Sequence, residues 1–288
     1  MESVSTTNNT IPFLYHYTSF DTLALILSNR TICFNSLLNV DDIEEAKTDD
    51  MGNFGRFIYA SCWTNDSNED IALWGLYTPN MHGVRIGLPR FPFKKFFYKK
   101  GDLNFDKDIE TFINMEKVYR DNVGSIVPNS LKLIEVQYTT DEKLLFPVVK
   151  RTSDYNLAEK YLNGEKVANL GLKRLEISYE YGDLGKYKHT DWRFQKEWRY
   201  ILPIMPIGMQ EYKNSSIEKH QMLIQRINNL YIKAPYDRFF LDLDDGAIKQ
   251  MEIVLGPRMS ESEKIYVKSL LKDHGLENNW RESKLRIR

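Results

Sequence analysis

The chain has 288 residues, of which 42% are hydrophobic and 27% are charged, a composition that excludes a disordered or fibrous protein. The 39 basic and 40 acidic side chains give a formal net charge of -1, so the overall balance does not indicate a nucleic-acid or membrane binder. Cys33 and Cys62 are too few for a disulfide scaffold, and the polar start lacks the apolar run of a secretion signal. We therefore expect a cytoplasmic protein that does not enter a membrane.

Short apolar runs and turn residues divide the first third of the chain into alternating strands and helices. The first ten residues are polar and predict a flexible lead to a domain that spans 11–288. The acidic stretch at 35–53 is typical of a surface loop. In chain order, the expected elements are a strand at 11–17, a helix capped by Thr18 or Ser19 and ending at Asn29, a strand at 31–34, a strand at 57–63, a helix at 71–77 capped by Asp66 or Asn68, and a strand at 84–88.

The rest of the chain is irregular in its middle and clearer toward its end. Residues 91–187 predict a helical insertion, with a helix at 106–119, a strand at 133–138 and a mixed helical stretch at 144–175. The elements expected after it are strands at 192–204, 230–232, 239–243 and 253–255, a helix at 261–272 and a short strand in the tail. Strands interleaved unevenly with helices favour a single mixed α+β domain.

Several common catalytic sites are excluded by the spacing of their residues. The chain has no GxxxxGK[ST] phosphate loop, no GxGxxG after a strand, no HExxH and no GxSxG. Its five histidines are scattered singly, so we expect no metal site.

The first of three clusters that could carry chemistry is YHYTS at 15–19, at the end of a predicted strand. His16 and two hydroxyls precede a helix there, and a helix N-terminus with such neighbours can hold a diphosphate or a ribose. The alternative is that Thr18 and Ser19 cap the helix and that His16 is a core residue.

The second cluster combines the strand end that contains Ser61 with Trp74 and Tyr77, which share one face of the following helix. These aromatic rings could form the wall around a flat ligand ring, or they could be core residues.

The third cluster is WRFQKEWRY at 192–200. On a strand, Arg193, Gln195, Glu197 and Arg199 lie on one side, with Glu197 between a glutamine and an arginine. A carboxylate held in this way can bind a ribose hydroxyl and stabilise an oxocarbenium ion, although an exposed Arg–Glu pair has the same pattern.

Together these segments resemble a known family. The stretches LYHYTSFDTLALILSNRTICFNSLLNVDD, IYASCWTNDSNEDIALWGLYTPNMHGVRIGL, DWRFQKEWRYI and MEIVLGPRMSESE, in this order, are similar over most of the chain to the bacterial family called domain of unknown function 2971. The shared features are the HYT start, a serine-ended strand followed by WxxY and a glycine-led strand, the E-W-R box, and a late strand that ends in Gly-Pro.

A more distant resemblance is to the nicotinamide-binding motifs of the ADP-ribosyltransferases, which implies a split, mainly antiparallel sheet with flanking helices and NAD as substrate. Tyr17 departs from the motif, because a small residue usually separates the histidine from the hydroxyl. By this resemblance His16 and Thr18 contact the adenosine-side ribose, Tyr77 or Trp74 stacks on nicotinamide, Glu197 binds the nicotinamide ribose, Gln195 orients the acceptor, and Tyr17 and Ser61 complete the cofactor-binding residues.

The resemblance implies an NAD-dependent ADP-ribosyltransferase that modifies a protein or a nucleic acid, as a toxin or phage-defence effector with an antitoxin or regulatory partner. One alternative is a catalytically inert binding module that uses the same cleft or the basic tail at 281–288 to hold nucleic acid or protein, and another is a nuclease-type defence effector. A pocket with His16, Tyr77 and Glu197 would favour the transferase. Glu197 buried against Arg199, away from His16, would favour the binding module.

Overall fold

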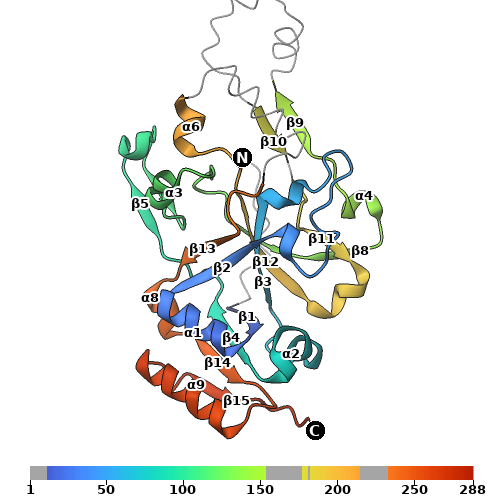
Figure 1. Cartoon of the computed structure of the whole chain (residues 1–288), viewed down its shortest axis with the longest axis vertical. Coiled ribbons are helices and arrows are strands. Elements are labelled where there is room, and N and C mark those ends of the chain that lie inside the picture. Colours follow the sequence, from blue (N-terminus) through green and yellow to red (C-terminus); the bar gives the residue numbers. More distant parts are fainter. Residues whose placement is uncertain (1–11, 154–176, 181, 215–232, 288) are drawn as a thin grey trace, which may run out of the picture.

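The computed structural model describes residues 12–153, 177–180, 182–214 and 233–287 (Figure 1). A nine-stranded sheet lies at its centre, and neighbouring strands in that sheet are antiparallel except for β14 and β15. The strands of this sheet are β1 (Phe13–Thr18), β2 (Thr31–Ser36), β3 (Ile58–Thr64), β4 (Val84–Pro89), β7 (Lys132–Glu135), β12 (Glu197–Pro203), β13 (Arg238–Asp242), β14 (Glu252–Leu255) and β15 (Trp280–Glu282).

Strand β3 is the point at which the sheet divides. One edge of β3 pairs with β12 along its whole length. The other edge pairs with the end of β2, and with β1 only where Tyr15 faces Thr64. Beyond Tyr15, β1 pairs with β4 alone, and the His16 side chain reaches back to the carbonyl of Cys62 on β3. The sheet is therefore mixed, mostly antiparallel and branched beside His16.

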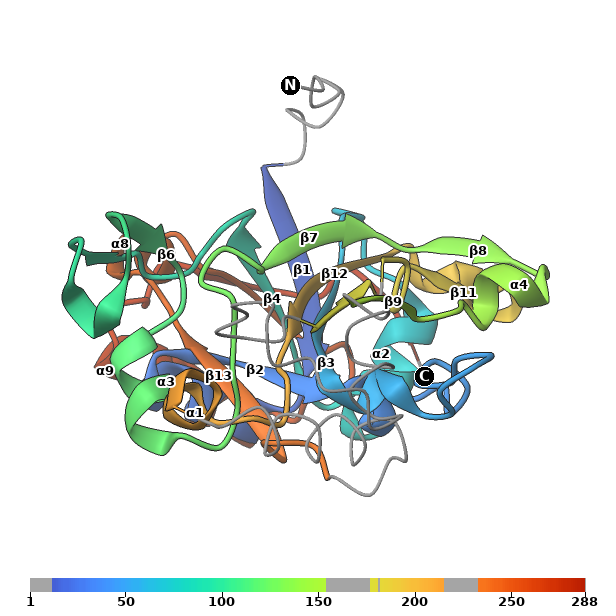
Figure 2. The ribbon, with the colours of Figure 1, turned by 90° about the horizontal axis from the view of Figure 1, so that it is seen from above.

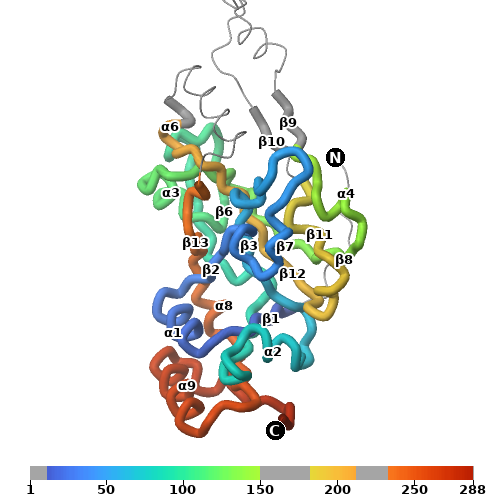
Figure 3. Tube along the Cα trace, turned by 45° about the vertical axis from the view of Figure 1, so that its right-hand side comes forward, coloured from blue at the N-terminus to red at the C-terminus, as the bar shows by residue number. Residues whose placement is uncertain are grey.

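Helices cover both faces of the sheet, because successive side chains of a strand point to opposite faces. Leu14 of β1 joins the largest core cluster with α1 (Phe20–Asn29), α3 (Met115–Asp121), α8 (Asp245–Lys249) and α9 (Glu261–Asp273). Tyr17 of the same strand packs on the opposite face against α2 (Ile71–Tyr77). Figure 3 shows α1 and α2 on either side of β1.

Residues 37–57 cover the face of β3 and β12 that carries Ala60 and Ile201. They include the short 3-10 turns η1 (Leu37–Asn39) and η2 (Phe54–Phe57), and Ala46, Met51 and Phe54 are buried in a second core cluster. The expected surface loop at 35–53 is exposed only in part, because Leu37, Ala46 and Met51 turn inward against the sheet while Leu38 and Ile43 stay exposed.

The described part of 91–187 contains mostly short strands where a helical insertion was expected. The helix predicted at 106–119 is instead a strand followed by α3, which begins after Asn114 because that side chain accepts from the backbone N–H of Lys117. Much of the stretch at 144–175 and all of 230–232 lie outside the described residues. The remaining elements are β5 (Phe96–Tyr98), β6 (Ile109–Thr111), α4 (Glu142–Leu145), β9 (Lys150–Ser153), β10 (Ile177–Glu180), α6 (Met209–Asn214), and the parallel pair β8 (Gln137–Thr139) and β11 (Tyr187–His189), with η3 (Pro79–Met81) and η4 (Asp102–Asn104).

Helix ends follow local hydrogen bonding. Ser19 caps α1 as expected, whereas α2 is capped by Asp70, which accepts from the N–H groups of Ala72 and Leu73. The pair β8 and β11 lies to one side of the main sheet, next to β7 and β12 (Figure 2). Among the described helices, none has the length and apolar character needed to cross a membrane.

Candidate functional site

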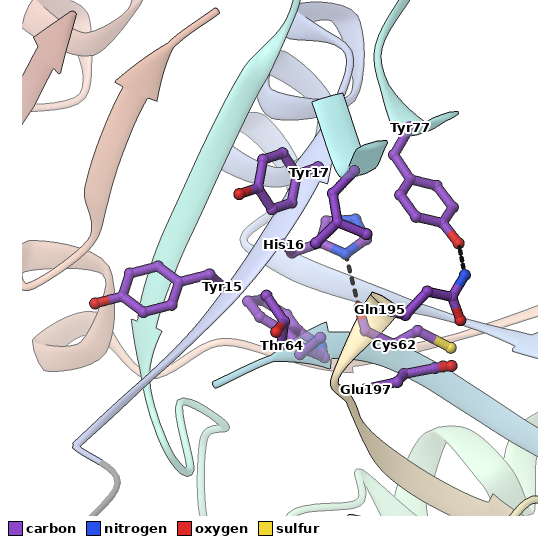
Figure 4. A pocket seen from close by; sticks show the side chains of 10 residues that line it. Tyr15, His16, Tyr17, Cys62, Thr64, Tyr77, Gln195 and Glu197 are labelled. Carbon is purple, nitrogen blue, oxygen red and sulfur yellow. Dashed lines mark hydrogen bonds between the residues drawn. The ribbon is translucent and has the colours of Figure 1, made fainter. Parts of the chain in front are cut away.

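A pocket of about 60 Å³ lies where β1 leaves β3 (Figure 4). Four segments that are distant in sequence form its walls. They are β1, the end of β3, α2, and the start of β12 together with Gln195 just before it. The lining residues are Tyr15, His16, Tyr17, Cys62, Trp63, Thr64, Leu73, Tyr77, Gln195 and Glu197. The three clusters singled out in the sequence therefore meet at one place.

His16 enters the pocket as a neutral imidazole. Its Nδ1 lies 2.8 Å from the carbonyl oxygen of Cys62, and because a carbonyl only accepts, Nδ1 carries the proton and Nε2 is the acceptor. Burial lowers the pKa of His16, and the backbone hydrogen bond opposes this shift only in part. The ring centroid lies 5.2 Å from that of Trp63, which holds the imidazole in place.

Tyr77 and Gln195 form the opposite wall. The Gln195 Nε2 donates to the Tyr77 hydroxyl (Figure 4). The Gln195 Oε1 accepts from Lys188 Nζ at 2.9 Å. Burial and then the nearby charge of Asp41, which is also hydrogen-bonded to the phenol, raise the pKa of Tyr77. Tyr77 therefore remains a neutral phenol, and both ends of the Gln195 amide are engaged.

Glu197 belongs to a buried network of charges. Its Oε1 accepts from Arg199 Nε at 2.6 Å, and its Oε2 accepts from Arg199 Nη2 at 2.9 Å and from Lys188 Nζ at 3.3 Å. Arg199 and Lys188 both also pair with Glu45, so two carboxylates balance two cations. All four side chains are at most 6% exposed. Such a network stays buried at little cost only while every charge is paired.

The charge state of Glu197 follows from this network. Burial alone would raise the pKa of Glu197, but the positive charges of Arg199 and Lys188 outweigh it and hold the pKa well below its usual range. Glu197 is therefore a carboxylate at physiological pH. A carboxylate this acidic stabilises positive charge well and removes protons poorly.

Five of the predicted site residues line the pocket, namely His16, Tyr17, Tyr77, Gln195 and Glu197. Tyr17 is held there structurally, because its hydroxyl accepts from the backbone N–H of Asp70 and its ring contacts Trp74 edge-on at 4.9 Å. Tyr17 thus anchors the start of α2 beside the pocket.

Thr18, Ser61 and Trp74 were also predicted as cofactor-binding residues, and they lie outside the pocket lining. Trp74 is fully buried in the core between α2 and the sheet, because it is one turn earlier on α2 than Tyr77 and faces the strands. Ser61 points to the other side of β3, where it accepts from the indole N–H of Trp63 at 3.0 Å. Thr18 is buried at the end of β1, opposite Val84.

The segment at 192–200 is not one continuous strand. A 3-10 turn, η5 (Thr190–Gln195), precedes β12, and Lys196 between them has a left-handed backbone with φ of 44°. Lys196 is secured by Thr64, whose hydroxyl donates to the Lys196 carbonyl, and by an ion pair with Asp66 at 2.6 Å. This turn exposes Arg193, which was expected beside Glu197, and buries Gln195.

Sequence reasoning missed Glu45 and Lys188. Glu45 lies in the acidic stretch that predicted a surface loop, and Lys188 lies on β11 without any motif. An isolated charged residue in such a stretch gives no local signal that it is buried. Among the described residues, no three His, Cys, Asp or Glu side chains come together as metal ligands.

A second hollow, of about 400 Å³, adjoins the start of β12 and also reaches Glu197. It is lined by Asn65, Glu135, Val136, Gln137, Tyr138, Arg193, Lys196 and Glu197. The Tyr138 hydroxyl accepts from the backbone N–H of Glu197 at 2.8 Å, which fixes the strand start between the two cavities.

Comparison with curated proteins and with solved structures finds no match for this chain. A protein-family model matches part of this chain. The matched range is shorter than the resemblance predicted from the sequence, because the HYT start and the late strand that ends in Gly-Pro lie outside it. Residues 73–200, which contain Tyr77, Gln195 and Glu197, match the family described as Protein of unknown function (DUF2971).

Proposed function

We propose that this protein is an NAD-dependent ADP-ribosyltransferase that modifies a macromolecule, either a protein or a nucleic acid. The observation that supports it best is that His16, Tyr77 and Glu197, from three distant segments, line one pocket. Their chemistry is complementary: a neutral imidazole acceptor, an aromatic ring and a carboxylate that stays ionised.

In the proposed reaction the bond between C1′ of the ribose and the nicotinamide nitrogen breaks, and its electron pair leaves with nicotinamide. Positive charge develops on the ribose, and the Glu197 carboxylate stabilises it. A nucleophile of the acceptor then bonds to C1′ and loses its proton to solvent. Because the pKa of Glu197 is strongly lowered, its role in this scheme is electrostatic.

The other pocket residues would bind and orient. The His16 Nε2 can accept a hydrogen bond from a ribose hydroxyl, and the Tyr77 ring can stack on nicotinamide. Gln195, which lines the pocket and not the neighbouring hollow, would orient the acceptor nucleophile through its amide once that group has reached Glu197.

The size of the pocket sets a condition on this proposal. Its volume of about 60 Å³ is far below the roughly 300 to 1,000 Å³ of typical ligand sites. NAD binding therefore requires the Tyr77 and Gln195 side chains to separate. Tyr77 is partly exposed at the end of α2, so we expect its side chain to be the part of the wall that moves.

The hollow beside Arg193 and Lys196 supports transfer to a large acceptor. Glu197 also lines this hollow, whose volume of about 400 Å³ accommodates an amino-acid side chain or a nucleobase. An acceptor there and a nicotinamide ribose at His16 would both lie next to Glu197.

One observation favours the inert binding module as a second candidate. Both Glu197 oxygens already accept from Arg199 or Lys188, as expected of a carboxylate kept for stability. The basic tail is a weaker candidate surface, because Arg281 pairs with the buried Glu69 at 2.8 Å and Leu285 packs on the cluster around Trp74.

The test is incubation of the protein with NAD labelled on the adenylate phosphate and a cell lysate, followed by separation of protein, RNA and DNA. Label in one of these fractions, absent with Glu197→Gln and present with Glu277→Gln, supports the proposal. Glu277 is an exposed glutamate outside both cavities and serves as the matched control. NAD binding without transfer or hydrolysis would instead identify a binding module that uses this cleft, and the absence of NAD binding would refute the transferase.

A further inference from the structure

We propose that Lys188 is a positioning residue of this site, which determines the atoms that Gln195 and Glu197 present to the pocket. The inference rests on the proposed function only for its kinetic consequence. Lys188 itself does not line the pocket that contains His16.

The Lys188 ammonium is enclosed by acceptors. Its side chain is 3% exposed, and Nζ lies 2.9 Å from Gln195 Oε1, 3.0 Å from Glu45 Oε1 and 3.3 Å from Glu197 Oε2. An ammonium has three protons and no acceptor, and here it donates hydrogen bonds to Gln195 and Glu197 and forms an ion pair with Glu45. The charge also lies 4.5 Å from the centre of the Trp192 ring, which covers it.

The first consequence concerns the orientation of the Gln195 amide. An ammonium can only donate, so the amide must turn its oxygen toward Lys188 and its NH₂ group toward the Tyr77 hydroxyl. Without the ammonium, the amide is free to rotate by half a turn. The Gln195 donors in the pocket are therefore set by a residue outside it.

The second consequence concerns the two oxygens of Glu197. Oε2 accepts from both Lys188 and Arg199, whereas Oε1 accepts from Arg199 Nε. Since each carboxylate oxygen has two lone pairs, Oε2 is filled by its two donors, and the remaining capacity of Oε1 is open to the Cys62 thiol, which hydrogen-bonds to Glu197, or to a ribose hydroxyl that displaces it. Lys188 thus gives Oε2 one more hydrogen-bond donor than Oε1 has from the Lys188–Arg199 pair.

A purely structural role for Lys188 would be to balance the charge of Glu45. Lys188→Met removes the cation alone, whereas Lys188→Met combined with Glu45→Gln removes one charge of each sign. If Lys188 only balances charge, the double variant regains both the melting temperature and the rate. If it positions Gln195 and Glu197, the double variant regains the melting temperature and stays slow.

We expect kcat for NAD cleavage to fall about a hundredfold in both variants, the loss typical of a misplaced reacting group, with a smaller change in KM. A second readout is independent of activity: the side-chain ¹⁵N–¹H signals of Gln195, assigned by their absence in Gln195→Glu. We expect them to exchange slowly with solvent in the wild type and rapidly in both Lys188 variants.

Recovery of kcat together with the melting temperature, or unchanged Gln195 signals in the Lys188 variants, would overturn the proposal. A wild-type protein without NAD turnover would refute the transferase function instead, and the Gln195 signals would still decide the positioning role.

Discussion

Gln195 donates a hydrogen bond to the Tyr77 hydroxyl, joining η5 to α2 across 118 residues of sequence and closing the wall of the pocket. A ligand larger than the pocket must separate these two side chains. Tyr77 is therefore the side chain that has to move, whereas Gln195, His16 and Glu197 are held by their own partners.

Tyr77 should contribute to NAD binding through its ring. Tyr77→Ala is expected to weaken NAD binding by about 1 kcal/mol, the value typical of an aromatic pair, whereas Tyr77→Phe keeps the ring and should be nearly neutral. Isothermal titration calorimetry of the three proteins measures this difference. Equal affinity of wild type and Tyr77→Ala would mean that the ring does not meet the ligand.

Trp74 should act on stability alone. Because it is fully buried beneath α2, Trp74→Ala is expected to cost about 3 to 5 kcal/mol of unfolding free energy, while Tyr77→Ala, at a partly exposed position, costs much less. Urea denaturation followed by fluorescence compares the two variants. Similar small losses for both would contradict the burial of Trp74.

Glu197→Gln should lower both rate and stability. Loss of the carboxylate removes the proposed electrostatic partner, at a cost of about a hundredfold or more in rate. It also leaves the buried Arg199 and Lys188 short of negative charge, which typically destabilises by about 3 to 5 kcal/mol. Glu45→Gln removes the other carboxylate of the same buried network, so it should lose a similar amount of stability. Comparing the two variants separates the loss of stability from the loss of rate. Wild-type turnover by Glu197→Gln would exclude Glu197 from the reaction.

The stability of the protein should depend on His16 below neutral pH. Burial lowers the pKa of His16 below its ordinary value of 6.5, so in the acid range the unfolded chain binds this proton more readily than the folded chain. The stability contributed by neutral His16 is complete above about pH 6.5 and is lost as the pH falls toward the lowered pKa. Melting temperatures of wild type and His16→Gln between neutral and mildly acidic pH should therefore converge. Parallel curves would show that His16 is not a buried neutral group.

Glu69 should hold the C-terminal tail to the domain. Its buried carboxylate accepts from Arg281 Nη1, the Ser283 hydroxyl and the backbone N–H of Lys284. Glu69→Ala is expected to cost about 1.5 to 3 kcal/mol, the range for hydrogen bonds to a charged group, and to speed proteolysis of the tail. Limited proteolysis with Glu277→Ala as control measures this. A tail that is cleaved at the same rate in both variants would argue against the tether.

Local features of the structure could be predicted from the sequence because they depend on neighbouring residues. The α+β class, the strands before and after α1, the Ser19 cap and the helix that ends at Tyr77 follow from periodicity and capping side chains. The break before Glu197 could not be predicted in this way, since Lys196 takes its left-handed conformation through contacts with Thr64 and Asp66.

The sequence by itself determined which side chains were available for chemistry at strand ends, and among them His16, Tyr77, Gln195 and Glu197. Only the tertiary structure decided that these four share one pocket, that Trp74 is core, and that Glu45 and Lys188 are buried beside Glu197. The physical reason is that the branching of the sheet at β3 and the pairing of β12 with it set these distances. A charged side chain is buried only where an opposite charge pairs with it, and that partner lies far away in the chain. The neighbouring sequence therefore does not predict which charged residues are buried.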